Sequence, residues 1–340
     1  MPLSWLAVFT YFVELVFIFS PRDKIYYETI FNFFRKALNY FNFFSTVTLA
    51  AQDSSERKPK KHYIGYGNLI TNDLLGVGRN RWRTGSVSSS RIWGADWKGE
   101  LPEEFNELVE IRIFGEIIAL SDLIGNKGID RPYVSHVALG MQSHFQHNGL
   151  EYSTGIEASF LGKQTWLSDF QTAFHKVACE HIPSETVLSR QIGNEVLFGP
   201  IVEIGETVLN GGRMSIRPFF EGYATAEILA RVGADIHFGR GFSGALFVRD
   251  PVTGQRYCVI LGKVNQIGFS VGGDVGHVAN SAFFDDTSAP MYNRRLRFRT
   301  GLHWVRKNRQ GFAGLTWLSK EFHGQPEAQI LGSVRLILKF

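Results

Sequence analysis

The chain has 340 residues, a hydrophobic fraction of 44% and a formal net charge of +4. This charge is too small to indicate a nucleic-acid-binding protein, so we expect no nucleic-acid partner. Two cysteines cannot build a disulfide framework. The 29 phenylalanines and 35 glycines favour a protein made of many strands and turns.

The first 51 residues differ in composition from the rest. Residues 3–20 form an apolar run of about one membrane span. Residues 35–51 have a basic start, a short apolar stretch and small residues at the end, which is the layout of a secretory signal. We interpret residues 1–51 as an N-terminal extension with the signal peptide; the alternative is a signal anchor at 3–20. A flexible polar arm is expected at 52–61 and the folded domain at 62–340.

From residue 62 onward, twelve segments alternate between two kinds of side chain. In one of them Arg295, Arg297 and Arg299 fall on one parity, while Leu296 and Phe298 fall on the other. Side chains of a strand alternate between two faces, so each segment presents a polar face and an apolar face. The segments lie at 62–71, 84–94, 106–120, 131–146, 149–162, 194–209, 213–224, 227–239, 265–284, 292–304, 310–322 and 328–340.

This pattern predicts an all-β fold, a 12-stranded antiparallel transmembrane β-barrel. In a membrane barrel the apolar row meets lipid and the polar row meets the lumen. No stretch after residue 51 is apolar enough for a transmembrane helix, so backbone groups in lipid would have to pair by closure of the sheet. The predicted location is the bacterial outer membrane, and we expect a monomer.

The last segment supports the same interpretation. Val334, Leu336, Leu338 and the terminal Phe340 share one parity, and the charged Arg335 falls on the other. A final amphipathic strand with a terminal aromatic residue resembles the signal that the barrel-assembly machinery reads in outer-membrane barrels. The alternative is an ordinary amphipathic strand of a soluble β protein.

Strand parity assigns the connections to the two ends of the barrel. With both chain ends in the periplasm, the connections at 72–83, 120–130, 162–189, 224–226, 285–290 and 322–327 lie outside the cell. In the longest, apolar residues recur at helical spacing, which predicts a short helix anchored over the rim by Trp166, Phe170, Phe174 and Val177.

One inner connection, residues 240–262, is long for the periplasmic side. Its turn sequence indicates an extra hairpin, which would raise the strand count to fourteen if it crossed the membrane. The two cysteines provide a check on this topology. Cys179 falls outside and Cys258 inside, separated by an apolar band roughly 25 Å tall, so they should not pair.

Several chemically active side chains fall at the outer rim by this parity. A carboxylate and an amide can hold a hard cation such as calcium, and a cation next to an ester carbonyl can stabilise a developing oxyanion. A neutral histidine can take a proton from water. The candidates are Asn72, Asp73, Thr84, Lys127, Asp130, His175, Glu180 and Glu185.

The ordered set of motifs resembles the LpxR family of outer-membrane lipid A 3'-O-deacylases, especially its alphaproteobacterial branch. Four stretches carry the resemblance, which extends over about residues 62–340. They are an Asn-Asp motif followed by a Thr-Gly element at 72–86, the exit of the second outer loop at 129–140, a Gln-to-His helix with the following strand start at 167–196, and the closing hairpin at 315–340.

The resemblance implies calcium-dependent hydrolysis of the 3'-acyloxyacyl ester of lipid A, the lipid anchor of lipopolysaccharide. By position, His175 would activate water and Asp73 would bind calcium. Asn72, Thr84, Glu180 and Lys127 would be further catalytic residues, Glu180 and Lys127 only by loose correspondence. Arg79, Arg81 and Arg83 would contact the phosphates of lipid A, or instead face the lumen or the headgroups. The sequence departs from the family at Asn80, where an acidic residue is usual.

Two other functions stay open at this point. One is a non-catalytic outer-membrane barrel, either a small channel or a structural protein. The other is a barrel phospholipase that uses a serine and a histidine.

Overall fold

The computed structural model describes residues 60–76, 78, 81–124, 130–178, 182–210, 214–239, 242–262, 266–285, 289–306 and 309–338. The predicted signal peptide and most of the predicted arm at 52–61 lie outside these ranges. In the described ranges, no helix is both long and apolar enough to cross a membrane.

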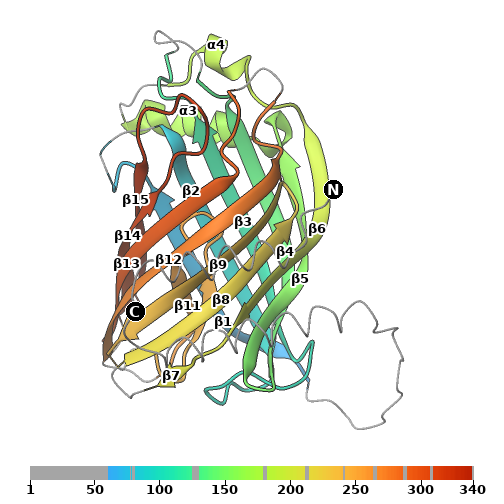
Figure 1. The fold of residues 1–340 in the computed structure, drawn as a ribbon, viewed down its shortest axis with the longest axis vertical. Helices are drawn as coiled ribbons and strands as arrows, with labels where there is room; N and C mark the ends of the chain where they lie inside the picture. Colours follow the sequence, from blue (N-terminus) through green and yellow to red (C-terminus); the bar gives the residue numbers. More distant parts are fainter. Residues whose placement is uncertain are drawn as a thin grey trace, which may run out of the picture. The chain divides into compact units, whose positions relative to one another are not determined.

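Twelve long strands of the described chain form one closed antiparallel sheet (Figure 1). Each long strand pairs with the next long strand along the chain, including β6 with β8. The first strand, β1, pairs with the last, β15, and this pairing closes the barrel. The strands are β1 (His62–Asn72), β2 (Trp82–Gly94), β3 (Leu108–Ala119), β4 (Val134–His147), β5 (Leu150–Leu161), β6 (Glu195–Gly205), β8 (Met214–Ala224), β9 (Glu227–Phe238), β12 (Gln266–Ser281), β13 (Arg294–Arg306), β14 (Arg309–Leu318) and β15 (Gln329–Leu338). The predicted 12-stranded barrel is confirmed.

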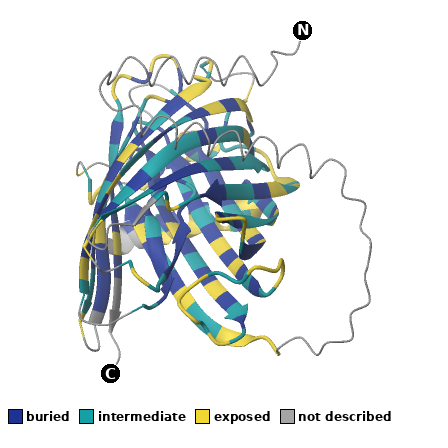
Figure 2. Cartoon of the chain, turned by 60° about the horizontal axis from the view of Figure 1, so that its bottom comes forward, coloured by how far each residue is buried: buried dark blue, intermediate teal, exposed yellow. Residues whose placement is uncertain are grey.

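The two faces of each strand differ in burial as the sequence predicts. On β13, Arg295, Arg297 and Arg299 are at most 4% exposed, whereas the intervening Phe298 is 57% exposed. Figure 2 shows the same alternation of buried and exposed bands along many strands. The charged side chains therefore point into the lumen and the apolar ones point outward, where a membrane barrel meets lipid.

The helices lie at one end of the barrel, which we call the helix end (Figure 1). The connection between β5 and β6 contains a 3-10 turn (Lys163–Thr165), α3 (Leu167–Ala178) and α4 (Glu185–Leu188). The connections β1–β2, β3–β4, β8–β9, β12–β13 and β14–β15 reach the same end because successive strands alternate in direction. Membrane barrels carry their long loops on the outer side, so we expect the helix end to face the cell exterior.

The predicted helix is present, but its orientation differs from the prediction. Trp166 is 75% exposed and Phe170 is 64% exposed, so these two residues do not anchor the helix to the rim. Among the helix side chains that the structure describes, the buried ones are the polar Ser168, Gln171 and His175. Gln171 has a hydrogen-bond partner on the barrel, the Tyr133 hydroxyl, so the face of α3 that carries Gln171 and His175 lies inward and Phe170 is left exposed. The side chains of the other predicted anchors, Phe174 and Val177, lie outside the described residues.

The long inner connection forms the extra hairpin, and this hairpin lies inside the barrel. It consists of β10 (Leu246–Arg249) and β11 (Arg256–Ile260), which pair only with each other in the described sheets. A Cβ atom at Gly65 or Gly67 of β1 would lie 2.5 or 2.6 Å from a carbonyl oxygen of β11, so glycine allows this close approach. The hairpin does not join the wall, and the wall keeps twelve strands.

Hydrogen bonds tie the hairpin to three parts of the wall. The Asp250 carboxylate accepts from Ser88 of β2, and Arg249 donates to Asp235 of β9. Gln255 donates to Thr316 of β14 and to two backbone carbonyls of β13 and β14. The hairpin enters the lumen from the end of the barrel opposite α3, and we call this end the hairpin end. Cys258 within it is a free thiol, as predicted; Cys179 lies outside the described residues.

A short additional strand, β7 (Leu209–Asn210), pairs with β8 at the hairpin end. It extends that edge locally and does not change the closure of the barrel.

Candidate functional site

Helix α3 holds two polar side chains against the barrel rim. Gln171 and His175 are one turn apart, which places them on the same face of the helix. They are 4% and 5% exposed. The Gln171 Oε1 atom accepts a hydrogen bond of 2.6 Å from the Tyr133 hydroxyl. Burial raises the pKa of Tyr133, so this hydroxyl stays protonated and remains a donor at neutral pH.

The turn after β1 places an amide and a carboxylate at the same end of the barrel. The Asn72 Oδ1 atom accepts from the backbone N–H of Leu74 at 2.7 Å, which leaves the Asn72 amide group as a donor. Asp73 is fully buried, and its Oδ2 atom accepts from the backbone N–H of Arg81 at 2.8 Å. The backbone N–H of Asp73 donates to the carbonyl of Thr84.

The second oxygen of Asp73 is unusual. Its Oδ1 atom is buried and has no hydrogen-bond partner among the described residues. Burial raises the pKa of Asp73 to about 7, against the backbone N–H groups that lower it. A buried carboxylate oxygen without a donor is a position where a bound cation would be stabilising.

The start of β2 is irregular next to this turn. Thr84 is the extra residue of a β-bulge, because Arg83 and Gly85 pair with consecutive residues of β3. Trp82 has a positive φ of 50°, a conformation that bulky residues rarely adopt, and its indole N–H donates to Asp130. Bulges and strained residues concentrate near functional sites because they re-aim side chains.

The predicted arginines have different environments. The Arg81 guanidinium lies 4.2 Å from the Trp82 ring centre and pairs with Glu327 at 2.7 Å. The Arg83 side chain instead points into the lumen, where it pairs with Glu321 at 2.6 Å and Glu116 at 2.5 Å. For Arg83 the lumen alternative of the sequence analysis is therefore correct, and its charge is already matched by carboxylates. Arg79, Lys127 and Glu180 lie outside the described residues.

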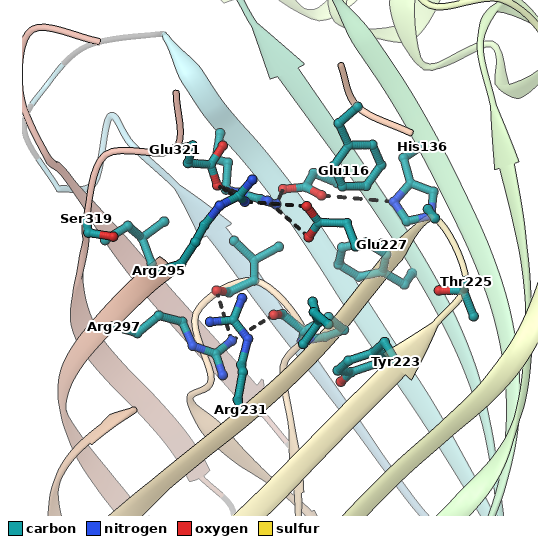
Figure 3. A pocket seen from close by; sticks show the side chains of 18 of the residues that line it. Glu116, His136, Tyr223, Thr225, Glu227, Arg231, Arg295, Arg297, Ser319 and Glu321 are labelled. Carbon is teal, nitrogen blue, oxygen red and sulfur yellow. Dashed lines mark hydrogen bonds and ion pairs between the residues drawn. The ribbon is translucent and has the colours of Figure 1, made fainter. Parts of the chain in front are cut away.

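The lumen near the helix end contains an ion network (Figure 3). One carboxylate, Glu321, accepts from the guanidinium groups of Arg83, Arg131 and Arg295 at 2.6 to 2.9 Å. Glu321, Arg83 and Arg295 line a cavity together with neighbouring side chains, and its volume is about 60 Å³. That is room for very few water molecules, so this part of the lumen is filled by its own side chains.

A serine and a histidine also meet inside the lumen. His136 Nε2 lies 3.1 Å from the Ser159 hydroxyl oxygen, and His136 Nδ1 lies 4.0 Å from a Glu116 oxygen. Ser159 is fully buried, and Glu116 already pairs with Arg83. A buried serine cannot reach a lipid ester without opening of the barrel, so this geometry does not favour the serine phospholipase.

The residues present can be tested for a calcium fit. Calcium takes six to eight oxygen ligands. The described residues contain no cluster of three or more potential metal-binding side chains of the His, Cys, Asp and Glu types. Asp73 Oδ1 is nevertheless a carboxylate oxygen without a hydrogen-bond partner among the described residues, and water and substrate oxygens would have to enter this buried position to complete a shell. The site fits a cation held by one carboxylate, not a preformed all-protein cage.

Gln171 and Tyr133 were not assigned a role from the sequence. The four-residue spacing between Gln171 and His175 could have identified Gln171 as a neighbour on the helix face. Tyr133 has no such local signal, because it lies 38 residues before its partner Gln171.

Comparison with known proteins supports the fold. No family model matches the sequence, and no curated protein matches it. Among solved structures, LpxR from Salmonella typhimurium is similar with a TM-score of 0.67 and 14% identity, over 81% of this chain and 100% of that one. The protein is an outer-membrane β-barrel. Its fold is like that of LpxR, and its location is the bacterial outer membrane.

Weaker similarities are found with other outer-membrane barrels. The NanC porin matches with a TM-score of 0.36 and 6% identity, over 82% of this chain and 100% of that one. The β domain of the Bordetella autotransporter BrkA matches with a TM-score of 0.39 and 10% identity, again over 82% and 100%.

Proposed function

We propose that this barrel is a lipid A 3'-O-deacylase, a hydrolase of the 3'-acyloxyacyl ester that uses calcium and a histidine-activated water. The observation that carries the proposal is the pairing of two features at the helix end. His175 lies on the barrel-facing side of α3, and at the same end Asp73 has a carboxylate oxygen without a hydrogen-bond partner in the part of the chain that the structure describes. The fold similarity to LpxR and the four sequence stretches support the same assignment.

The proposed reaction needs one general base and no nucleophilic side chain. His175, as neutral imidazole, takes a proton from water while the water oxygen attacks the ester carbonyl carbon. The carbon–oxygen bond to the sugar then breaks, and His175 returns the proton to the departing 3' oxygen. The products are a free hydroxyl on lipid A and a carboxylic acid, without a covalent acyl-enzyme.

Other residues would orient and stabilise these steps. The free amide group of Asn72 can donate a hydrogen bond to the developing oxyanion. Gln171, positioned by Tyr133, holds the face of α3 that carries His175 against the rim. Calcium, when held by Asp73, would supply positive charge next to the ester carbonyl. Thr84 and Arg81 border this region, and we retain Lys127, Glu180 and Arg79 as proposed contacts.

The outer face of α3 suits a lipid substrate. Trp166 and Phe170 are exposed there at the end of the barrel that faces the outer leaflet. Aromatic side chains are favoured where apolar chains and headgroups meet. Acyl chains of lipid A would contact these rings while the ester reaches His175.

The test is incubation of the purified protein with lipid A in detergent and calcium, followed by mass spectrometry. We expect loss of one 3'-acyloxyacyl group, removal of this activity by chelation of calcium, and abolition by His175→Ala. The matched control is His323→Ala, which removes an exposed histidine from a connection at the same end and should leave activity intact. Inert wild-type protein, or full activity of His175→Ala, would refute the proposal.

Two further readouts separate the alternatives. Ion conductance without hydrolysis would favour a channel. Covalent labelling of the protein by a fluorophosphonate would favour a serine hydrolase.

A further inference from the structure

A second and larger cavity lies at the hairpin end, away from α3. Its volume is about 710 Å³, and it is bounded by the hairpin and by the wall from β4 to β9. The side chains that matter for its chemistry are Arg249 and Arg256 from the hairpin, Gln142 from β4, Arg217 from β8 and His237 from β9. By the orientation of the barrel, this cavity is on the periplasmic side.

Most cations of this cavity are paired. Arg217 contacts Glu151 and Glu203 at 2.6 Å each. Arg249 contacts Glu203 at 3.0 Å and Asp235 at 2.9 Å. These two guanidinium groups therefore pair with the acidic side chains that face them from β5, β6 and β9, which are Glu151, Glu203 and Asp235.

Arg256 is the exception. Its Nη2 atom donates to the backbone carbonyl of Phe247 at 3.3 Å, and no carboxylate of the described residues lies within ion-pair distance. Burial and then the like charge of Arg217 lower the pKa of Arg256 to about 10. The carboxylates of Glu151 and Glu203 raise this pKa and offset the other effects only in part. A buried guanidinium group without a direct ion-pair partner stabilises an anion that reaches it.

Two further polar groups that line the cavity lack partners. The Gln142 Oε1 atom accepts from Ser153 at 2.8 Å, which leaves its buried Nε2 group without an acceptor among the described residues. Both ring nitrogens of His237 are buried and also unpartnered there, while the ring stacks on Phe242. Gln142 and His237 are each 6% exposed. Buried donors without acceptors are costly unless a ligand or water satisfies them.

We infer that the cavity at the hairpin end is a binding site for a phosphate group, held by Arg256 together with Gln142 and His237. A phosphate has three or four oxygens in a tetrahedral arrangement, so it can accept hydrogen bonds from the hairpin and from two separate strands at once. A carboxylate has only two oxygens in one plane and can accept from fewer donors on separate strands. The inference does not depend on the proposed deacylase activity, because the site shares no residue with the helix end.

The volume leaves open whether the phosphate is free or part of a larger molecule. The cavity is larger than inorganic phosphate needs. Inorganic phosphate and phosphoethanolamine, a soluble fragment of a phospholipid headgroup, therefore serve as the two probes.

The experiment is isothermal titration calorimetry of the detergent-solubilised mature chain with each probe, at constant ionic strength set by sodium chloride. We expect saturable binding to the wild-type protein. Arg256→Gln should weaken it by about tenfold or more, the size expected for a lost hydrogen bond to a charged group. Gln142→Glu should weaken it similarly, because a nearly isosteric side chain then repels the anion. The control Arg91→Gln changes an exposed arginine of β2 outside the cavity and should bind like wild type.

The outcomes separate the two sources of phosphate and also test the site itself. Tighter binding of phosphoethanolamine would indicate a headgroup, and tighter binding of inorganic phosphate a free anion. If Arg256→Gln does not fold, Gln142→Glu alone decides. Absence of saturable binding to the wild-type protein, or wild-type affinity in the folded variants, would overturn the inference.

Discussion

Asp250 offers a direct test of how the hairpin is held inside the barrel. It is fully buried at the tip of the hairpin. Its carboxylate accepts three hydrogen bonds, from the Ser88 hydroxyl at 2.7 Å and from the Thr253 backbone N–H and hydroxyl at 2.8 and 2.6 Å. The change Asp250→Ala removes the acceptor and leaves these donors buried.

The expected effect on docking of the hairpin is large. Hydrogen bonds to a charged group contribute about 1.5–3 kcal/mol each. The two hydroxyl groups can rotate to other acceptors, whereas the backbone N–H cannot. We therefore expect a loss of about 3–4 kcal/mol, which increases the undocked population by about 100- to 1,000-fold. Glycines 65 and 67 and the contacts of Arg249 and Gln255 would still favour the docked state.

Cys258 reports this equilibrium directly. It is a free thiol, 7% exposed within β11, and burial raises its pKa to about 11. In a Cys179→Ser background, a charged maleimide should react slowly with the wild-type hairpin and 100- to 1,000-fold faster after Asp250→Ala. The matched control is Asp96→Ala, which removes a carboxylate that is 96% exposed.

Two results would contradict the reasoning. One is a labelling rate of Asp250→Ala within twofold of wild type, which would mean that these hydrogen bonds do not hold the hairpin. The other is an equal acceleration by Asp96→Ala, which would trace the effect to general loss of acidic charge.

Two further predictions concern the helix end. Glu321→Gln should lower the free energy of unfolding by about 3–5 kcal/mol in urea titrations, because three arginines lose their shared carboxylate. The control is Glu327→Gln, which removes the carboxylate of a half-exposed ion pair and should lower the free energy of unfolding by less than about 1 kcal/mol. Burial opposes ionisation of Glu321, but the three guanidinium groups outweigh it and hold the pKa of Glu321 well below 4.5. The contribution of Glu321 to stability is therefore present above about pH 4.5 and declines as the pH falls further. If the difference in unfolding free energy between wild type and Glu321→Gln does not change down to pH 3, this linkage is wrong. Tyr133→Phe should reduce lipid A turnover by about tenfold with little change in stability, since it removes only the hydrogen bond to Gln171; unchanged turnover would show that α3 is positioned without it.

Strand parity made the barrel predictable from residue types alone. Arg295, Arg297 and Arg299 had to share a face because side chains of a strand alternate with period two. Once that face is charged and the opposite face is apolar over twelve segments, a closed barrel in lipid is the arrangement that pairs the backbone. The same parity correctly placed Asn72, Asp73 and α3 at one end.

The orientation of α3 was less accessible to this reasoning. Helical spacing of Trp166 and Phe170 predicts a helix, but not which of its faces meets the protein. Gln171 accepts a hydrogen bond from the Tyr133 hydroxyl on the barrel, so Gln171 and His175 lie on the buried side and the rings of Trp166 and Phe170 are exposed. A buried hydrogen-bond partner on a distant segment can decide which side of a helix meets the protein, and apolar spacing does not reveal it.

The amino-acid sequence by itself determined the barrel, its twelve alternating segments, its inner and outer faces and the end that carries Asp73 and His175, because these depend on a local period of two. Only the tertiary structure decided that the inner connection folds into the lumen and leaves the wall with twelve strands, and that Arg83 is matched by luminal carboxylates. It also decided that, among the described residues, Asp73 Oδ1 has no hydrogen-bond partner and Arg256 has no direct ion-pair partner. Those properties depend on which side chains from distant strands meet, and no local pattern encodes such meetings.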